Sequence, residues 1–178
     1  MPEDQTQKID YIKSVFAHNQ GLIELADTKA NIVLGINSIL IPLIFGVTTV
    51  NFIDLLDKNL QIHAILLNTF SLIGLVLLVI SLVFSILVIK ARLSEELENF
   101  IFFENILKTE YDDYKNNILN MNEEAILDDY LKEIYTLAGI NKIKYNRYEW
   151  TLRFLISGII SLISGYFILA VCNYFIIF

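Results

Sequence analysis

Three long apolar runs constrain this chain more than any other feature of its sequence. The first, from Asn31 to Val50, contains no charged residue, and its roughly 20 residues at about 1.5 Å rise each match the ~30 Å hydrocarbon core of a bilayer. Two further runs follow, at residues 62–89 and 152–178. Only 19% of the 178 residues are charged, whereas about a quarter are charged in a typical soluble domain. The sequence therefore predicts a membrane protein whose spans are helices.

The segments outside these runs are polar and have helical rather than strand periodicity. We predict an all-α membrane protein with three transmembrane helices and a small helical cytoplasmic domain. Nothing interrupts the helical pattern before the first span, so the N-terminal helix and span one should be continuous. The predicted order is an N-terminal amphipathic helix at 1–30, span one at 31–50, an external loop at 51–61, span two at 62–89, the cytoplasmic helical domain at 90–151 and span three at 152–178.

Two local signals predict where helices begin and end in the cytoplasmic domain. Asn122 is a favourable N-cap, and Glu123 and Glu124 follow in the first turn, where acidic side chains are stabilising. Gly139 predicts a turn, after which Asn141 restarts a helix that enters span three.

The basic residues predict the orientation in the membrane. Of the 13 Lys and Arg residues, only Lys58 lies in the loop between spans one and two. All the others precede span one or lie between spans two and three or at their edges. Cytoplasmic loops carry the excess of Lys and Arg, so we expect a cytoplasmic N-terminus and a C-terminus on the periplasmic or external side.

Small and polar residues recur along one face of span one at spacings of three and four. They are Asn31, Gly35, Ser38, Pro42, Gly46 and Thr49, and a similar row in span three contains Ser157, Ser161 and Gly165. Small residues let transmembrane helices approach closely, so one interpretation is a packing seam, including a seam between copies of the chain in a homo-oligomer. The other interpretation is a pore-lining or gating face with a kink at the proline. The pattern leaves both open.

No catalytic or metal-binding motif is recognisable. The chain has no P-loop, G-x-S-x-G or H-E-x-x-H motif. The single cysteine, Cys172, lies in span three, and His18 and His63 are far apart in sequence, so no Cys/His metal site is expected. A net charge of −7 argues against binding of a nucleic-acid polymer. We therefore expect no enzyme activity, no metal and no resident cofactor.

The charged entrance to span one is the strongest candidate for a binding site. In the predicted topology it lies at the cytoplasmic membrane surface, close to basic and aromatic residues from the other spans. Such residues can hold a phosphate and a base, but the same cations can hold lipid headgroups instead. The candidate ligand-binding residues are Asp27, Thr28, Lys29, Arg92, Lys144, Tyr145 and Arg147.

The segment Leu25-Ala-Asp-Thr-Lys-Ala-Asn-Ile-Val-Leu-Gly-Ile-Asn37 resembles the opening signature of the Pycsar transmembrane effector family, although the family more often has a small residue at the position of Asn31. Later segments resemble its aromatic stretch, its acidic-Tyr segment, its last cytoplasmic helix and its entry to the final span. They are Asn99-Phe-Ile-Phe-Phe-Glu104, Tyr111-Asp-Asp-Tyr114, Tyr130-Leu-Lys-Glu-Ile-Tyr135 and Lys142-Ile-Lys-Tyr145.

The resemblance implies a bacterial antiphage effector of the inner membrane. Such an effector responds to a cyclic pyrimidine mononucleotide, cUMP or cCMP, that a phage-activated cyclase makes, and it impairs the membrane so that infection is abortive. The partners would be the lipid bilayer, the cyclic nucleotide and other copies of the chain, which would associate through a seam that also includes Asn37. Two alternatives remain open: a non-enzymatic membrane subunit that binds a protein partner, and a constitutive holin-like pore former.

Overall fold

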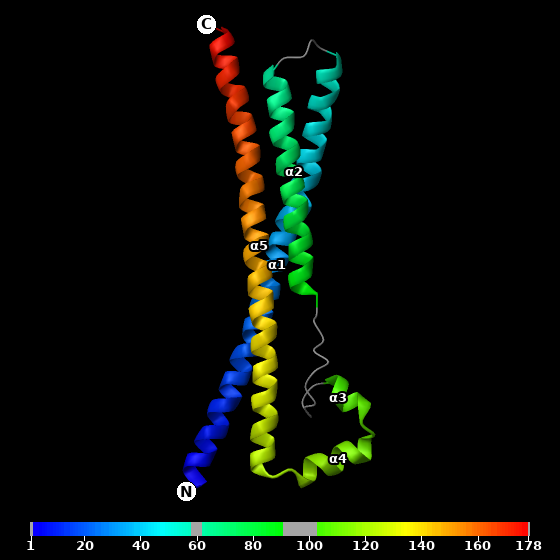
Figure 1. Ribbon diagram of the computed structural model, residues 1–178, viewed down its shortest axis with the longest axis vertical. Helices are drawn as coiled ribbons and strands as arrows, with labels where there is room; N and C mark the ends of the chain where they lie inside the picture. The colour runs from blue at the N-terminus through cyan, green and yellow to red at the C-terminus, as the bar shows by residue number, and fades with distance from the viewer. Residues whose placement is uncertain (1, 58–61, 91–102, 178) are drawn as a thin grey trace. The chain divides into compact units, whose positions relative to one another are not determined.

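The computed structural model describes residues 2–57, 62–90 and 103–177. Nearly all of these residues are helical and none of them lies in a strand, so the predicted all-α class is confirmed. The helices are α1 (Pro2–Asp57), α2 (Ile62–Ile89), α3 (Phe103–Lys108), α4 (Tyr111–Asn120) and α5 (Glu123–Ile177), coloured along the chain in Figure 1.

The chain divides into two compact units, and α1 and α5 each contribute to both. The membrane unit comprises Asp27–Lys90 and Tyr145–Phe178. The polar unit comprises Met1–Ala26 and Ala91–Lys144.

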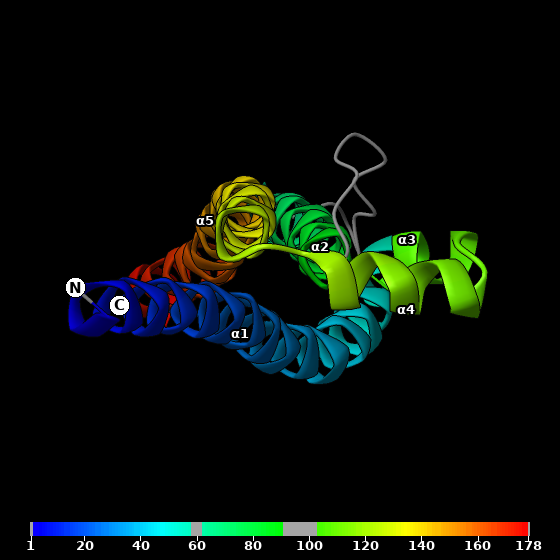
Figure 2. The same cartoon turned by 90° about the horizontal axis from the view of Figure 1, so that it is seen from below.

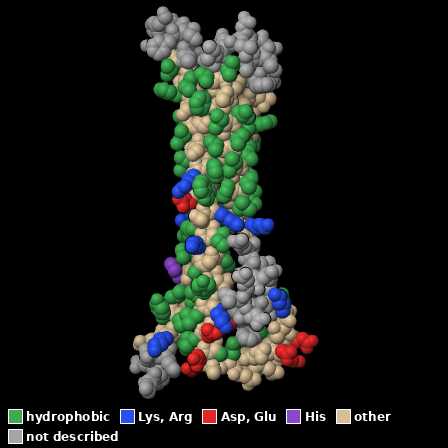
Figure 3. Space-filling model, viewed as in Figure 1, with side chains coloured by type: hydrophobic (Ala, Val, Ile, Leu, Met, Phe, Trp, Pro, Cys, Tyr) green, Lys and Arg blue, Asp and Glu red, His purple; other side chains and the backbone are tan. Residues whose placement is uncertain are grey.

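The membrane unit is a bundle of three helices. Within it α1 and α5 run in the same direction and α2 runs in the opposite direction (Figure 1), and the labels of all three can be followed in the view from below (Figure 2). Each of the three helices contains a segment long and apolar enough to cross a membrane. Among the residues that Figure 3 colours, hydrophobic side chains cover the visible face of this unit, and charged side chains gather at one of its ends. The protein is therefore a membrane protein with three potential spans.

A small apolar core joins the three helices of the membrane unit. Val33 of α1, Leu78 of α2 and Leu155 and Leu162 of α5 are buried against one another. Many other apolar side chains of the unit remain exposed, among them Ile39, at 70%. Exposed apolar surface of this extent suits contact with lipid rather than water.

Glycines let α2 and α5 approach closely. A Cβ atom built on Gly74 would lie 2.8 Å from the side chain of Leu162 and 3.1 Å from the carbonyl oxygen of Gly158. A Cβ on Gly158 would lie 3.2 Å from the carbonyl oxygen of Gly74, and one on Gly165 would lie 2.9 Å from Phe70 Cβ. The two backbones thus pack where no larger side chain fits, as small residues permit in membrane helices.

The polar unit packs the start of α1 against the first half of α5. The Phe16 ring meets the Tyr130 ring edge-on with centroids 5.6 Å apart. Asn141 Nδ2 donates to both Asn19 O, at 3.0 Å, and Asn19 Oδ1, at 3.2 Å. These contacts hold two segments together that lie more than 100 residues apart in the sequence. By contrast, α4 has no buried residue.

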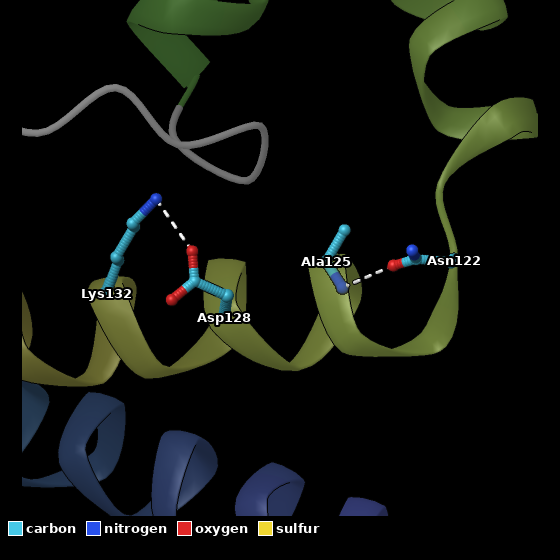
Figure 4. Close-up of polar contacts among 4 residues, drawn as sticks. All are labelled: Asn122, Ala125, Asp128 and Lys132. Carbon is cyan, nitrogen blue, oxygen red and sulfur yellow. Dashed lines mark hydrogen bonds and ion pairs between the residues drawn. The ribbon is translucent and has the colours of Figure 1, made fainter.

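The start of α5 has the predicted cap. Asn122 Oδ1 accepts a hydrogen bond from the backbone N–H of Ala125 at 2.8 Å, which satisfies one of the free donors at the helix N-terminus (Figure 4). One turn further on, Lys132 Nζ lies 2.8 Å from Asp128 Oδ2 (Figure 4). This hydrogen bond and the charge of Asp128 raise the pKa of the exposed Lys132 ammonium. The ion pair therefore stabilises the fold below the ordinary lysine pKa, and the contribution is lost as pH rises through the raised value.

Two features differ from the sequence-based expectation. Gly139 does not form a turn but lies inside the continuous α5. A single glycine lowers helix stability by only about 1 kcal/mol, which its helix-forming neighbours outweigh. In addition, the helix that carries span one continues past Val50 and ends at Asp57, so it includes most of the predicted loop at 51–61.

Candidate ligand site at the charged end of the membrane unit

Lys29 lies between two tyrosine rings at the charged end of the membrane unit. Its ammonium nitrogen is 5.8 Å from the ring centroid of Tyr145 and 5.8 Å from that of Tyr148. The two tyrosines are three residues apart on α5, so their side chains lie on the same face of the helix. All three side chains are partly buried. The geometry is that of a cation–π interaction shared between two rings, which stabilises by roughly 0.5–2 kcal/mol.

Asp27 and Thr28 precede this lysine on α1. Asp27 is partly buried and Thr28 is exposed. Both take part in polar interactions within the folded chain. An acid, a hydroxyl and a base therefore occupy consecutive positions where α1 enters the membrane unit.

Arg147 connects α5 to the end of α2. Its Nη1 atom donates a hydrogen bond to the carbonyl oxygen of Leu87 at 2.6 Å. The last carbonyls of a helix have no partner within the helix, and a cation there is also favoured by the helix dipole. Arg147 thus has a structural role in this unit.

A buried network of hydrogen bonds connects all three helices of the membrane unit just inside this charged end. Asn37 Nδ2 of α1 donates to Ser81 Oγ of α2 at 3.1 Å, and Ser81 Oγ donates to the carbonyl oxygen of Thr151 of α5 at 3.0 Å. The three residues are fully buried. Thr151 Oγ1 in turn donates to the carbonyl oxygen of Arg147 at 3.0 Å. The hydrogen-bond network therefore extends from α1 to the turn of α5 that carries Tyr145 and Tyr148.

We expect Ser81→Ala to destabilise the membrane unit by about 1 kcal/mol. The substitution removes the hydroxyl that bonds to both neighbouring helices and leaves the Asn37 amide with neither polar atom paired, a cost of this order for buried groups in membrane helices. Ser85→Ala is the matched control. Ser85 is equally buried on the same helix, but its hydroxyl bonds only to the carbonyl oxygen of Ser81.

Unfolding in mixed micelles with increasing denaturing detergent measures both variants. The expected order of stability is wild type, then Ser85→Ala, then Ser81→Ala. If the two variants lost the same stability, the cross-helix hydrogen bonds would contribute nothing of their own.

Two of the predicted ligand residues fall outside the described part of the membrane unit. Lys144 belongs to the polar unit, where it is 6% exposed and engaged in interactions of its own. Arg92 lies outside the described residues. The part of the predicted set that lies together in the membrane unit is thus Asp27, Thr28 and Lys29 on α1 with Tyr145 and Arg147 on α5.

The structure divides the predicted seam of small residues into two groups. Gly35, Ser38, Pro42 and Gly46 of α1 and Ser157 of α5 are exposed, and nothing lies within 4 Å of a Cβ built on either of these glycines. The remaining members contact neighbouring helices of the same chain: Asn37 bonds to Ser81, Ser161 Oγ donates to Phe70 O at 2.9 Å, and Gly165 packs on Phe70. The second group packs the bundle itself, and only the first is open to another molecule.

The sequence pattern missed two parts of this end of the bundle. Tyr148 was not among the candidate ligand-binding residues, yet its ring lies near the Lys29 ammonium. The buried hydrogen-bond network through Asn37, Ser81 and Thr151 was not expected. In the sequence, Ser71, Gly74, Ser81 and Ser85 recur along one face of span two, which indicates a polar face but not its partners.

Comparison with known proteins identifies the family. The family model described as the Pycsar effector protein domain matches residues 11–171. The chain belongs to the Pycsar effector family. It is therefore an antiphage defence effector, and the suspected family is confirmed. No curated protein and no solved structure matched the chain.

Membership of the Pycsar effector family and the three apolar helices together indicate a membrane effector. Among the described residues, no group of three or more His, Cys, Asp or Glu side chains is placed to hold a metal ion. At the charged end of the membrane unit, Lys29 combines a positive charge with the faces of two tyrosine rings, Tyr145 and Tyr148.

Proposed function

We propose that this Pycsar effector responds to a cyclic pyrimidine mononucleotide, cUMP or cCMP, and impairs the inner membrane without catalysing a reaction. The observation that carries the proposal is Lys29 held between Tyr145 and Tyr148 where the apolar spans begin. A cyclic mononucleotide has one negative charge and one flat base. The lysine supplies the opposite charge, and each tyrosine supplies a face on which the base can stack.

Binding of the nucleotide would replace the contact between Lys29 and the two tyrosine rings with contacts to the ligand. In the structure the Lys29 ammonium lies near both rings. A phosphate would draw the ammonium towards itself, since a charge-assisted hydrogen bond is stronger than a cation–π contact. A ring freed in this way could then stack on the pyrimidine, with Asp27 or Thr28 able to bond to the ribose.

The connection to the membrane follows from which elements carry these residues. Lys29 is on α1 directly before the first apolar run, and the tyrosines are on α5, which is bonded to α2 through Arg147. A change in the relation of α1 to α5 would act on the hydrogen bonds from Asn37 through Ser81 to Thr151. The ligand must bind the active state better than the resting state, and reversal of a 1:99 balance needs roughly 5.5 kcal/mol of differential affinity. In an oligomer, each copy would need to supply only part of this differential binding free energy.

Association of copies would use the exposed small-residue face of α1. Gly35, Ser38, Pro42 and Gly46 lie on the outside of the membrane unit, and small residues of this kind allow close packing of membrane helices. With the N-terminus in the cytoplasm, as the distribution of basic residues indicates, the nucleotide site would face the compartment in which a cyclase works. The C-terminus would lie on the periplasmic or external side.

Phage challenge of bacteria tests this function. Cells would carry the effector with a pyrimidine cyclase, the effector alone, or the effector with a catalytically inactive cyclase. We expect uptake of a membrane-impermeant dye before lysis, and fewer plaques, only in cells with the active cyclase. Protection from phage without dye uptake would contradict the membrane role, and dye uptake without the cyclase would favour a constitutive pore former.

A further inference from the structure

A cavity of about 430 Å³ lies between α1 and α2 in the membrane unit. Its size falls in the range of small-molecule sites in proteins, about 300–1,000 Å³. The cavity is lined by Phe45, Thr48, Thr49, Ile65, Asn68, Thr69, Leu72 and Leu75. None of these residues belongs to the charged end that carries Lys29.

One side chain at the cavity wall has polar groups without a partner. Both Nδ2 and Oδ1 of Asn68 are buried and make no hydrogen bond within the described chain. The three threonines of the lining differ, because Thr48, Thr49 and Thr69 each donate to the carbonyl oxygen four residues earlier on their own helix, at 2.8–2.9 Å. An unpaired buried amide in an apolar region costs roughly 1–3 kcal/mol. Asn68 is therefore the one lining residue whose chemistry calls for an external partner.

The place of the cavity limits what can fill it. Phe45, Ile65 and Leu72 are each at least 40% exposed on the outside of the membrane unit, where the surrounding medium is lipid. Asn68 is six residues from the start of α2 at Ile62, which corresponds to roughly 9 Å along the helix. This depth lies between the start of α2 and the middle of a ~30 Å hydrocarbon core, which is the level of the upper acyl chains just below the lipid ester groups.

We propose that this cavity is a binding site for one acyl chain of a bilayer glycerophospholipid, held by a hydrogen bond from Asn68 Nδ2 to an ester carbonyl of the lipid. The apolar lining suits the chain, and the carbonyl supplies the acceptor that the amide lacks. Asn68 lies at the cavity wall and the terminal torsion of asparagine is broad, so rotation of its side chain presents Nδ2 to the lipid. The site joins α1 to α2 through a lipid near the loop end of the bundle.

Photolabelling with a lipid tests the site in the full-length protein. The protein is reconstituted in phosphatidylglycerol vesicles that contain a small fraction of phosphatidylglycerol with a diazirine in one acyl chain, and adducts are mapped by mass spectrometry after irradiation. We expect adducts at residues 45–49 and 65–75 in excess of those at exposed apolar positions elsewhere, such as Ile39 and Val83.

Three variants separate this site from general lipid contact. Asn68→Leu should lower adducts in the cavity by about three- to tenfold, the affinity equivalent of one hydrogen bond. Leu72→Trp, which fills the cavity, should lower the number of cavity adducts further. Val83→Trp, three turns further along α2 and outside the cavity lining, should leave the number of cavity adducts unchanged. Asn68→Leu removes an unpaired polar group and keeps a similar volume, so it should fold, and helicity and a monodisperse elution profile check this.

Two results would overturn the proposal. Equal labelling of the cavity and of the other exposed apolar positions in every variant would mean ordinary surrounding lipid. Cross-links between two copies through residues 65–75, with no lipid adduct in the cavity, would mean that a second copy fills it.

Discussion

Gly158→Val should destabilise the membrane unit by about 2–3 kcal/mol, the upper range for overpacking of a well-packed core. A Cβ at this position would already lie 3.2 Å from the carbonyl oxygen of Gly74 and 3.2 Å from the side chain of Leu78. The contact with Gly74 involves backbone, which cannot rotate away, so α2 and α5 would have to separate. Separation would also strain the hydrogen bond from Ser161 Oγ to Phe70 O.

Gly139→Val is the matched control for this variant. Gly139 is also a glycine inside α5, but nothing lies within 4 Å of a Cβ placed on it. The Gly139→Val variant should be close to neutral, because the valine has space and its helix propensity is no worse than that of glycine. Unfolding in mixed micelles compares the two variants, and equal stability of Gly158→Val and Gly139→Val would refute the close approach of α2 and α5.

The second large effect is expected at Lys29, and it concerns the ligand. Lys29→Met should weaken binding of the activating nucleotide by roughly 10- to 150-fold, since a hydrogen bond to a charged group contributes about 1.5–3 kcal/mol. Methionine keeps much of the apolar length and removes the charge. The ligand-free protein should lose at most the cation–π contribution, roughly 0.5–2 kcal/mol.

Lys90→Met controls for the general loss of a cation. Lys90 lies just after α2 in the same unit and is exposed, so its removal should leave affinity close to that of wild type. Titration of detergent-solubilised protein with nucleotide gives the affinities, and detergent unfolding gives the stabilities. Normal binding and normal membrane leakage by Lys29→Met would remove this lysine from the site.

The long helices could be predicted from the sequence because their signal is local. Long apolar runs mark the spans, and Asn122 followed by two glutamates marks the start of α5. The prediction of a turn at Gly139 was wrong because one glycine is weak evidence against a helix of 55 residues. The end of α1 at Asp57 likewise shows that the end of an apolar run need not be the end of the helix.

The contacts between helices could be predicted only in part, because they depend on the rotation and register of each helix. The row of small residues on α1 seemed the best candidate for close packing, yet Gly35 and Gly46 face outward. The tight contact is made instead by Gly74, Gly158 and Gly165 on α2 and α5. On α5 the packed face passes through Gly158 rather than its exposed neighbour Ser157, a difference of one residue, or about 100° around the helix.

In the candidate site, too, the features set by neighbouring residues could be predicted from the sequence, and the contacts between distant residues could not. The charged entrance to span one is visible in the sequence, and a topology of three spans brings it to the same side as the start of span three. The pairing of Lys29 with Tyr145 and Tyr148 joins residues more than 100 positions apart. The hydrogen bonds among Asn37, Ser81 and Thr151 span 44 and 70 residues. Periodicity assigns such residues to a face but cannot name the partner.

The most direct measurement of the central claim is dye release from liposomes that carry the purified protein. Cyclic UMP, cyclic CMP, cyclic AMP and cyclic GMP would be added separately, with liposomes that carry the Lys29→Met variant alongside. The account predicts release with one cyclic pyrimidine nucleotide, none with the purine nucleotides, and a matching loss of response in the variant. No release with any of the four from intact, correctly oriented protein would contradict it.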